Sequence, residues 1–454
     1  MKTIVPAKEN IAKLWGHPKP KEDVQYRPMK YLLKTQVEDG TLVHNVVTGQ
    51  LVFLDKNEEK QLEDTASTNI DSITELITNC YMVPVEFDEY KQVNQLRNIL
   101  RLIDDYRSDA IASYTILPTT YCNARCFYCY EADFKKSTMT DETADRVINF
   151  IHDNCRMNPV HIGWFGGEPT VGEKTIDRIC AGLSAKGVSF SSQMVSNGYL
   201  FTESLVEKAV NGWKLDRIQI TLDGTEEVYN KAKDYKTAKD NPYERVIRNI
   251  ELLLDAGVTV GILLNMDFYN VDDLRKLIME LASKFCERKN LFISSHPLFD
   301  AVGYNPVTHS EDDETQLVLM NYKLGEFIQS QGLNFAIMDK TKLGKLPKLE
   351  YQYCMADSKK TILIDPDGYF FKCEHLNGGT GSSYNLLSNM IDEKELQSWR
   401  IYDEYPRCGE CPLYPSCIRA KKCPELETCS DIKVNHRIGE YSKLAIAMLR
   451  NGHS

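Results

Sequence analysis

The hydrophobic and polar positions after residue 112 predict a repeating strand and helix pattern. Short runs of β-branched and aromatic residues alternate with longer stretches in which hydrophobic residues recur at helical spacing, most clearly at 140–155, 243–256 and 271–285. This alternation predicts a parallel sheet covered by helices, with the functional site in loops at the carboxyl ends of the strands. The expected strands are 113–117, 161–165, 189–195, 217–222, 258–265 and 291–295.

Residues 1–112 show a different pattern. Between residues 31 and 54, three strand-like runs are separated by turns that end in Gly40 and Gly49, which predicts an antiparallel meander. We therefore expect a small separate domain at 1–112. Helices are expected after the meander at 57–63, 71–79 and 88–103, with a wing strand at 81–85.

Residues 336–454 are rich in cysteine and form a third expected domain, after a β/α domain at 113–335. Their clearest element is a hairpin at 361–373, whose turn has the sequence Asp-Pro-Asp-Gly. A final helix is expected at 436–450.

Length and charge narrow the function classes. A chain of 454 residues is too long for one hydrophobic core. The net charge of −11 argues against nucleic acid as a main partner. The N-terminus has no apolar signal-peptide core, and no run approaches the ~18 apolar residues of a membrane span, so we expect a cytoplasmic protein with no membrane partner. In that compartment, 14 cysteines indicate metal binding rather than disulfides.

The first group of cysteines lies in the sequence YCNARCFYCY, directly after the first expected strand. Cys122, Cys126 and Cys129 place three thiolates on one loop, which predicts a metal site that lacks a fourth protein ligand. Four other cysteines are isolated, and we expect them to be small buried hydrophobic residues. They are Cys80, Cys155, Cys180 and Cys286.

The Cys-x3-Cys-x2-Cys loop after the first strand of a β/α repeat resembles that of the radical S-adenosylmethionine (SAM) enzymes. The resemblance implies a partial (β/α)6 TIM-like barrel in which the three cysteines hold a [4Fe–4S] cluster. The open iron of that cluster would bind SAM, and an electron donor such as flavodoxin or ferredoxin would allow formation of a 5′-deoxyadenosyl radical. The alternative is a zinc site with three cysteines and a distant fourth ligand.

Later motifs, each after an expected strand, extend the resemblance. Glu168 would receive the ammonium group of SAM, and the backbone of Tyr128 would meet the adenine. Asn265 would either face the cofactor or serve as a buried cap. The matching motifs are Gly166-Gly167-Glu168-Pro169, Ser196-Asn197-Gly198 and Thr221-Leu222-Asp223-Gly224. In the second motif, Ser196 and Asn197 would contact the ribose and carboxylate of SAM.

The C-terminal cysteine pattern resembles the SPASM domain of radical SAM peptide-modifying enzymes, although five residues precede Cys423 where the family usually has three. The resemblance implies two auxiliary [4Fe–4S] clusters, and thus three clusters in all. A zinc ribbon is the alternative. The first auxiliary cluster would be held by Cys354, Cys373 and Cys423, and the second by Cys408, Cys411, Cys417 and Cys429.

Two such clusters need eight protein ligands, and this segment has seven cysteines. We therefore expect an open iron in the first auxiliary cluster, available to a substrate thiol, a water or His375. Glu374 matches the position of a catalytic base in sulfatase-maturing enzymes; a solvated carboxylate is the alternative.

The N-terminal meander and helices resemble the RiPP recognition element, a winged-helix-like module that binds the leader of a ribosomally made precursor peptide by strand addition. A packing extension is the alternative. Together these features predict a radical SAM/SPASM peptide maturase that forms a thioether or, second, a carbon–carbon crosslink. The rival functions are a sulfatase-maturing enzyme, which forms formylglycine, and a zinc-containing regulator.

Overall fold

The fold of the chain is described by a computed structural model. It describes residues 1–15, 20–64, 70–106, 110–155, 159–238, 240–298, 310–334, 345–352, 354–376, 384–385, 393–424, 426 and 428–450.

Six parallel strands form the centre of the fold, as the sequence pattern predicts. They pair in chain order, so each β/α unit adds one strand beside the previous one. The strand residues that pack in one core with the helices are apolar, and Ile162, Ile218 and Ile220 are fully buried. The strands are β7 (Ser113–Thr119), β8 (Val160–Gly166), β9 (Phe190–Ser196), β10 (Leu215–Leu222), β11 (Thr259–Met266) and β12 (Leu291–Pro297).

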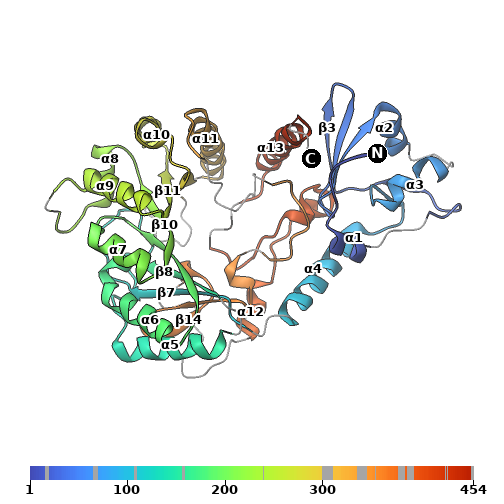
Figure 1. Ribbon diagram of the computed structural model, residues 1–454. Helices are drawn as coiled ribbons and strands as arrows, with labels where there is room; N and C mark the ends of the chain where they lie inside the picture. The colour runs from blue at the N-terminus through green and yellow to red at the C-terminus, as the bar shows by residue number, and fades with distance from the viewer. Residues whose placement is uncertain are drawn as a thin grey trace.

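Helices cover the outer side of this curved sheet (Figure 1). Their starts follow local capping: Thr140 accepts from the Thr143 amide at the start of α5, and Thr202 accepts from the Leu205 amide at the start of α7. The described helices are α5 (Asp141–Asn154), α6 (Glu173–Ala185), α7 (Glu203–Asn211), α8 (Glu226–Lys233), α9 (Pro242–Asp255), α10 (Val271–Phe285) and α11 (Glu311–Ser330), with a short 3-10 turn η1 at Pro169–Gly172.

The predicted C-terminal hairpin is confirmed, and it extends the parallel sheet. Strand β13 (Thr361–Ile364) pairs in parallel with β7, while β14 (Tyr369–Phe371) and β15 (Tyr384–Asn385) follow antiparallel. Asp365 closes the turn by accepting from the amides of Asp367 (3.0 Å) and Tyr369 (2.8 Å). The sheet therefore has nine strands, and the cysteine-rich segment is joined to the β/α region through main-chain hydrogen bonds.

The N-terminal meander is also present. Strands β3 (Leu32–Val37), β4 (Gly40–Asn45) and β5 (Leu51–Asp55) pair antiparallel. Strand β1 (Lys2–Val5), which the pattern did not predict, pairs with the outer edge of β5. A Cβ at Gly40 would lie 2.1 Å from the Leu54 carbonyl oxygen, so this tight approach requires glycine.

The expected wing strand does not join the meander. Residues Met82–Pro84 form β6, which pairs with β2 (Tyr26–Pro28) in a separate two-stranded sheet. The strand expected at 81–85 is therefore confirmed at Met82–Pro84, and β1 is the strand that pairs with β5. The helices near it are α1 (Glu9–Trp15), α2 (Lys56–Glu63), α3 (Ile70–Thr78) and α4 (Glu89–Tyr106).

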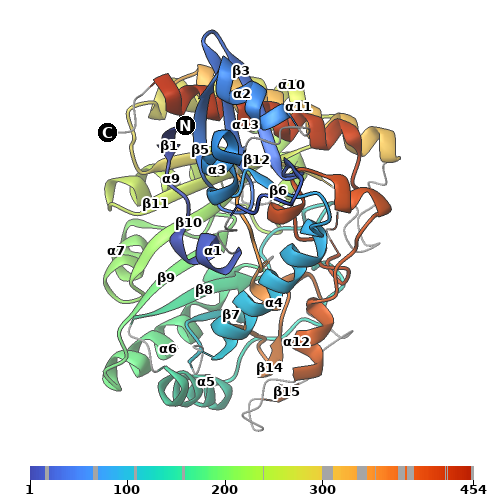
Figure 2. The ribbon, with the colours of Figure 1, turned by 90° about the vertical axis from the view of Figure 1, so that its right-hand side faces the viewer.

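The N-terminal elements and the last cysteine-rich segment lie against each other. Figure 2 shows α4 running toward α12 (Glu393–Trp399), and α13 (Asp431–Arg450) beside β3. Arg400 after α12 forms an ion pair with Asp105 at 2.6 Å. The final helix begins at Asp431, five residues earlier than the sequence pattern indicates. Within the described ranges, no helix is long and apolar enough to cross a membrane.

The isolated cysteines divide into two kinds. Cys80 and Cys180 are buried, as expected. Cys155 is half-buried and Cys286 is exposed, so the expectation of a buried residue is wrong for Cys286. It lies just after α10, where the chain turns toward solvent.

Candidate active site

The loop after β7 holds the first three cysteines close together. Cys122, Cys126 and Cys129 are half-buried thiols. Burial raises the pKa of Cys122 to about 12 and that of Cys129 to about 11, and the negative charge of the neighbouring cysteines adds to both shifts. Three thiols with raised pKa values in one place would be stabilised as thiolates by a bound metal group.

The Gly166-Gly167 sequence lets the end of β8 approach this loop. A Cβ at Gly167 would lie 2.5 Å from the carbonyl oxygens of both Thr120 and Tyr121, and Gly166 has a φ of +109°. The amide of Glu168 donates to the Tyr121 carbonyl at 2.9 Å. The loop after β8 can therefore lie directly against the cysteine loop only because glycine has no side chain.

Glu168 is buried and joins this surface to the end of β9. Its Oε1 accepts from the Thr170 hydroxyl (2.5 Å), the Thr170 amide (3.1 Å) and the Ser196 hydroxyl (2.8 Å), and its Oε2 accepts from the Asn197 amide (2.8 Å). Burial raises the pKa of Glu168, while these donors oppose the shift. Pro169 begins the 3-10 turn η1, which Glu168 caps.

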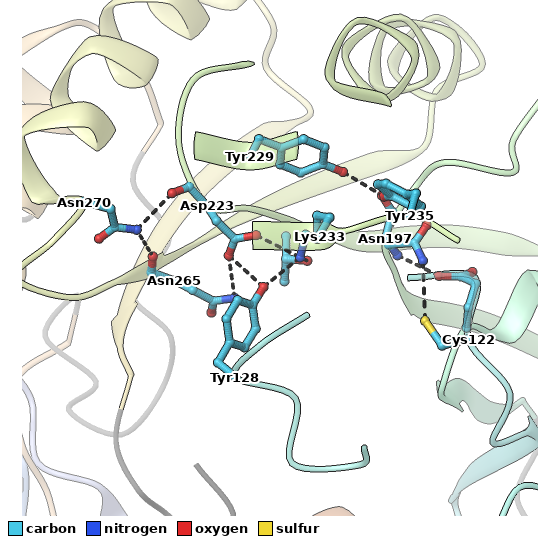
Figure 3. Close-up of polar contacts among 11 residues, drawn as sticks. Cys122, Tyr128, Asn197, Asp223, Tyr229, Lys233, Tyr235, Asn265 and Asn270 are labelled. Atoms are coloured by element: carbon cyan, nitrogen blue, oxygen red, sulfur yellow. Dashed lines mark hydrogen bonds and ion pairs between the residues drawn. The ribbon is translucent and has the colours of Figure 1, made fainter. Parts of the chain in front are cut away.

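Asn197 reaches from β9 to the cysteine loop (Figure 3). Its Nδ2 donates to Asn123 Oδ1 at 2.7 Å and lies 3.9 Å from Cys122 Sγ. The Nδ2 of Asn123 is buried, and no residue in the described part of the chain accepts from it. A polar donor thus remains available beside Cys122.

The hydroxyl of Tyr128 reaches a buried ion pair (Figure 3). Its hydroxyl donates to Asp223 Oδ1 at 2.7 Å and accepts from Lys233 Nζ at 2.8 Å. Lys233 Nζ also lies 3.0 Å from Asp223 Oδ2 and donates to the Thr221 hydroxyl at 2.7 Å. Burial lowers the pKa of Lys233, but Asp223 together with Tyr128, Cys126 and Tyr229 outweighs burial and holds the pKa well above its usual range.

Lys233 was missed by the sequence reasoning, since a lysine at the end of a helix carries no signal of its own. Asn265 supports the same pair: its Nδ2 donates to Asp223 Oδ1 at 3.0 Å. Asn270 donates to the carbonyls of Asp223 and Asn265, both at 2.9 Å. Of the two roles expected for Asn265, these contacts favour the buried structural one.

The C-terminal cysteines form two separate groups. In the first, burial raises the thiol pKa values of Cys354 and Cys373 to about 12. The charges of Asp357 and Cys423 add to the shift of Cys354, and those of Glu374, Cys354 and Cys423 add to the shift of Cys373. Cys373 and Cys423 pack against the buried cluster of Ala356, Trp399 and Ala420.

The second group contains Cys408, Cys411, Cys417 and Cys429. Burial raises the pKa of Cys411, and the charges of the other three add to the shift. Arg407 donates to Cys429 Sγ at 3.2 Å. Among the residues with a described placement, no three His, Cys, Asp or Glu side chains are arranged to hold a single metal ion.

The first cysteine loop and the first C-terminal group meet at a pair of rings. The ring of Tyr130, next to Cys129, lies 4.6 Å from that of His375, two residues after Cys373. His375 in turn lies 4.0 Å from Glu374. Glu131, which the sequence reasoning missed, is buried here; burial raises its pKa to about 7, and nearby Glu374 adds to the shift.

Comparison with known proteins agrees with this arrangement. Residues 116–281 match the family model of the radical SAM superfamily. Over 308 residues the chain is 24% identical to GTP 3′,8-cyclase of Clostridium perfringens strain 13, covering 63% of this chain and 88% of the relative.

Two solved structures share the fold. Streptococcus suis SuiB bound to S-adenosylmethionine has a TM-score of 0.55 at 16% identity and covers 91% of this chain and 99% of its own. Native anSMEcpe with bound AdoMet has a TM-score of 0.56 at 17% identity and covers 75% and 98%. The match over residues 116–281, together with the parallel sheet, therefore makes this region of the chain similar to the radical SAM superfamily.

Proposed function

We propose that this chain is a radical SAM peptide maturase, which crosslinks a ribosomally made precursor peptide. Its match to the radical SAM superfamily supports SAM dependence. SuiB bound to the precursor peptide SuiA covers 90% of this chain at a TM-score of 0.54, so the shared fold extends well beyond the superfamily match. anSMEcpe has likewise been solved with AdoMet and the Cp18Cys peptide. These neighbours support a peptide substrate.

Cys122, Cys126 and Cys129 would hold a [4Fe–4S] cluster, with SAM beside it. The residues fit this group because the Gly167 position leaves no room for a Cβ and Asn123 offers a buried donor. When bound, the cluster and SAM supply a 5′-deoxyadenosyl radical that abstracts a substrate hydrogen. Gly166, Gly167, Pro169 and the main chain of Tyr128 would shape the pocket. Polar contacts to SAM would come from Glu168, Ser196 and Asn197.

The hydrogen bonds of Glu168 limit which of its two carboxylate oxygens could bind SAM. Four donors already use this carboxylate, three of them at Oε1. An ammonium group would therefore approach Oε2, which accepts only the Asn197 amide among the described residues. Ser196 would then act mainly through Glu168.

The two C-terminal groups would hold one auxiliary [4Fe–4S] cluster each. The separation into Cys354, Cys373 and Cys423 on one side, and four cysteines on the other, supports this division. The first group would leave one ligand position for a substrate thiol, a water or His375. A substrate thiol held there favours a thioether product.

Glu374 is proposed as a base toward the substrate. Its position beside His375, facing the first cysteine loop across Tyr130, supports a place between the two cysteine groups. Glu131, which is buried, would be a second carboxylate able to accept a proton in this region. Flavodoxin or ferredoxin would supply the electron.

The N-terminal elements would bind the leader. Strand addition needs an open sheet edge. At one edge of the meander, β1 covers β5. At the other edge, α13 lies beside β3, and the Thr35 hydroxyl donates to Ser442 at 3.0 Å. Because β1 has only four residues and none of them is buried, a leader would take the β5 edge by displacing β1.

The division of ten cysteines into groups of three, three and four carries this proposal. Its test is the iron and sulfide content of anaerobically reconstituted protein, before and after replacing Cys122, Cys126 and Cys129 with alanine. About twelve irons falling to about eight is the expected result; zinc without sulfide would overturn the proposal. Peptides encoded beside the gene, incubated with the reduced enzyme and SAM, should lose a pair of hydrogens by mass.

Two other reactions have specific support. Glu374 and the fold of anSMEcpe favour sulfatase maturation, for which a sulfatase-derived peptide would yield formylglycine. The sequence likeness to GTP 3′,8-cyclase favours a nucleotide substrate. If the enzyme converted GTP and changed no peptide, the nucleotide reaction would replace the peptide reaction as its function.

A further inference from the structure

The short strand β1 lies at the edge of the meander where the proposed leader would pair. It runs antiparallel to β5, with Lys2 opposite Phe53 and Thr3 opposite Val52. Its four residues are exposed or half-buried, whereas β4, inside the same sheet, is buried along its whole length. Such a strand adds little buried surface to the fold, and its main-chain pairing can be supplied by any extended peptide. β1 therefore shows which kind of segment this edge accepts.

An irregularity in the pairing places two neighbouring apolar side chains on one face of the sheet. The register shifts between Thr3 and Val5, so Ile4 is the extra residue of a β-bulge. In a regular strand, Ile4 and Val5 would point to opposite faces. Here both pack against the same hydrophobic cluster. The bulge therefore fits a pair of adjacent apolar residues.

The cluster that receives these two side chains is built from the meander and the final helix. Leu42 and Leu51 of the meander and Ala445 of α13 are its buried members, and α13 lies beside the sheet (Figure 1). Phe53 and Leu449 are half-buried and pack around them. Aliphatic side chains at this edge therefore remove apolar surface from water, while polar side chains in the same place would lose hydrogen bonds to water.

We infer that this edge recognises an extended segment of the precursor peptide that carries two adjacent aliphatic residues, and that β1 is an internal copy of that segment. The inference rests on the leader binding of the proposed function and names the chemistry of the leader. Pairing with β5 supplies affinity, and the cluster around Phe53 and Leu449 supplies selectivity. The two positions before the aliphatic pair, which match Lys2 and Thr3, are exposed and accept polar residues.

β1 and the peptide compete for one edge, so the measured affinity depends on how often β1 leaves it. The apparent dissociation constant is the intrinsic one divided by the fraction of molecules with an open edge. The double variant Ile4→Ser/Val5→Ser removes the apolar pair from β1 and raises this fraction. It leaves every residue of the meander and of α13 in place.

The test uses the full chain, anaerobically reconstituted, and a fluorescein-labelled peptide with the sequence of residues 1–8, MKTIVPAK. Fluorescence polarisation should show binding to the Ile4→Ser/Val5→Ser variant that is tighter than binding to wild type by about tenfold or more. The same peptide with Ser-Ser in place of Ile-Val should bind neither protein. Equal binding of the two peptides would overturn the inference, and so would no binding of the Ile-Val peptide to the double variant.

Two further substitutions, each added to the double variant, test the cluster itself. Phe53→Ala and Leu449→Ala should each weaken binding of the Ile-Val peptide by about tenfold. Ile401→Ala is the matched control, because Ile401 is an apolar residue outside the cluster with 56% of its surface exposed. An equal loss of binding in all three would contradict the inference. If Phe53→Ala does not fold, Leu449→Ala decides alone.

Other outcomes separate this inference from the proposed function. Protein that holds about twelve irons and cleaves SAM, but does not distinguish the two peptides, overturns the inference and leaves the radical chemistry standing. Selective peptide binding by protein that holds zinc without sulfide overturns the proposed reaction and leaves the peptide-binding edge standing. If the double variant dimerises on size-exclusion chromatography and the peptide does not reverse this, the edge accepts a second copy of the chain and the inference fails.

Discussion

Arg97 on α4 donates to the carbonyl oxygen of Cys417, 2.9 Å away and 320 residues later in the chain. The same guanidinium also donates to the carbonyls of Tyr414 and Glu350. Arg97 is buried, so an N-terminal helix directly positions the main chain that carries the second C-terminal cysteine group. Cys408 and Cys411 also pack against the N-terminal hydrophobic core.

Replacing Arg97 with methionine should therefore loosen the second C-terminal cysteine group. Several buried carbonyls would lose their donor, at a cost of about 1–3 kcal/mol for each that stays unsatisfied. We expect a lower melting temperature and selective loss of about four irons, measured by thermal unfolding and metal analysis. Arg288→Met is the control, since Arg288 pairs with Asp255 near the surface; similar iron loss in both variants would argue against the role of Arg97.

Gly167→Ala should disrupt the first cysteine site. The added Cβ would meet the carbonyl oxygens of Thr120 and Tyr121 at 2.5 Å, which forces the cysteine loop and the β8 loop apart. Iron content should fall by about four per chain, and SAM binding, measured by calorimetry, should weaken. Gly439→Ala is matched to it, because a Cβ at Gly439 meets nothing within 4 Å; it should gain up to about 1 kcal/mol in helix stability.

The stability of the protein should depend on pH through His44. This side chain is buried on β4, its Nε2 lies 2.5 Å from the Pro347 carbonyl oxygen, and burial lowers its pKa from 6.5 to about 4. Between those two pH values the unfolded chain binds a proton that the folded chain does not. Stability should therefore fall as the pH drops from 6.5 to 4, by about 3 kcal/mol from this residue.

The measurement is the melting temperature at several pH values for wild type and His44→Gln. The glutamine variant can donate to the same carbonyl and has no proton to gain, so its pH dependence should be shallower in this window. Identical profiles for the two proteins would contradict the assignment. His152→Gln, at an exposed position, controls for a general loss of histidine.

If β1 occupies the leader site, weakening it should tighten peptide binding. Thr3 pairs with Val52 in the middle of β1, and proline there removes a backbone donor. Thr3→Pro should bind a fluorescently labelled precursor peptide more tightly than wild type, as judged by polarisation. Thr3→Ala, which keeps the main chain, should behave like wild type; weaker binding by Thr3→Pro would mean that β1 supports the site instead of covering it.

Much of the β/α region could be predicted from local pattern. The six strands and the helices at α5, α9 and α10 appear within a few residues of their expected positions, because each is set by hydrophobic periodicity and by nearby caps such as Thr140 and Asn241. The order of the motifs also predicted that Glu168, Ser196 and Asn197 would meet, since the carboxyl ends of parallel strands lie at one edge.

The partners of side chains could not be predicted in the same way. Lys233 contacts Tyr128, 105 residues earlier, and Glu131 lies near Glu374 only because β13 pairs with β7. Likewise, the pattern did not predict that β1 would pair with β5 or that β6 would pair with β2, although each segment alone has a strand-like sequence.

The amino-acid sequence by itself determined the strands, the helices and the cysteine loop, because spacing along the chain is enough to define period, turn and motif. The tertiary structure alone decided that Asp223 and Lys233 are paired, that Arg97 supports Cys417 and that β1 covers β5. These contacts join residues far apart in the chain, and their strength comes from burial and charge, which exist only once the segments have packed together.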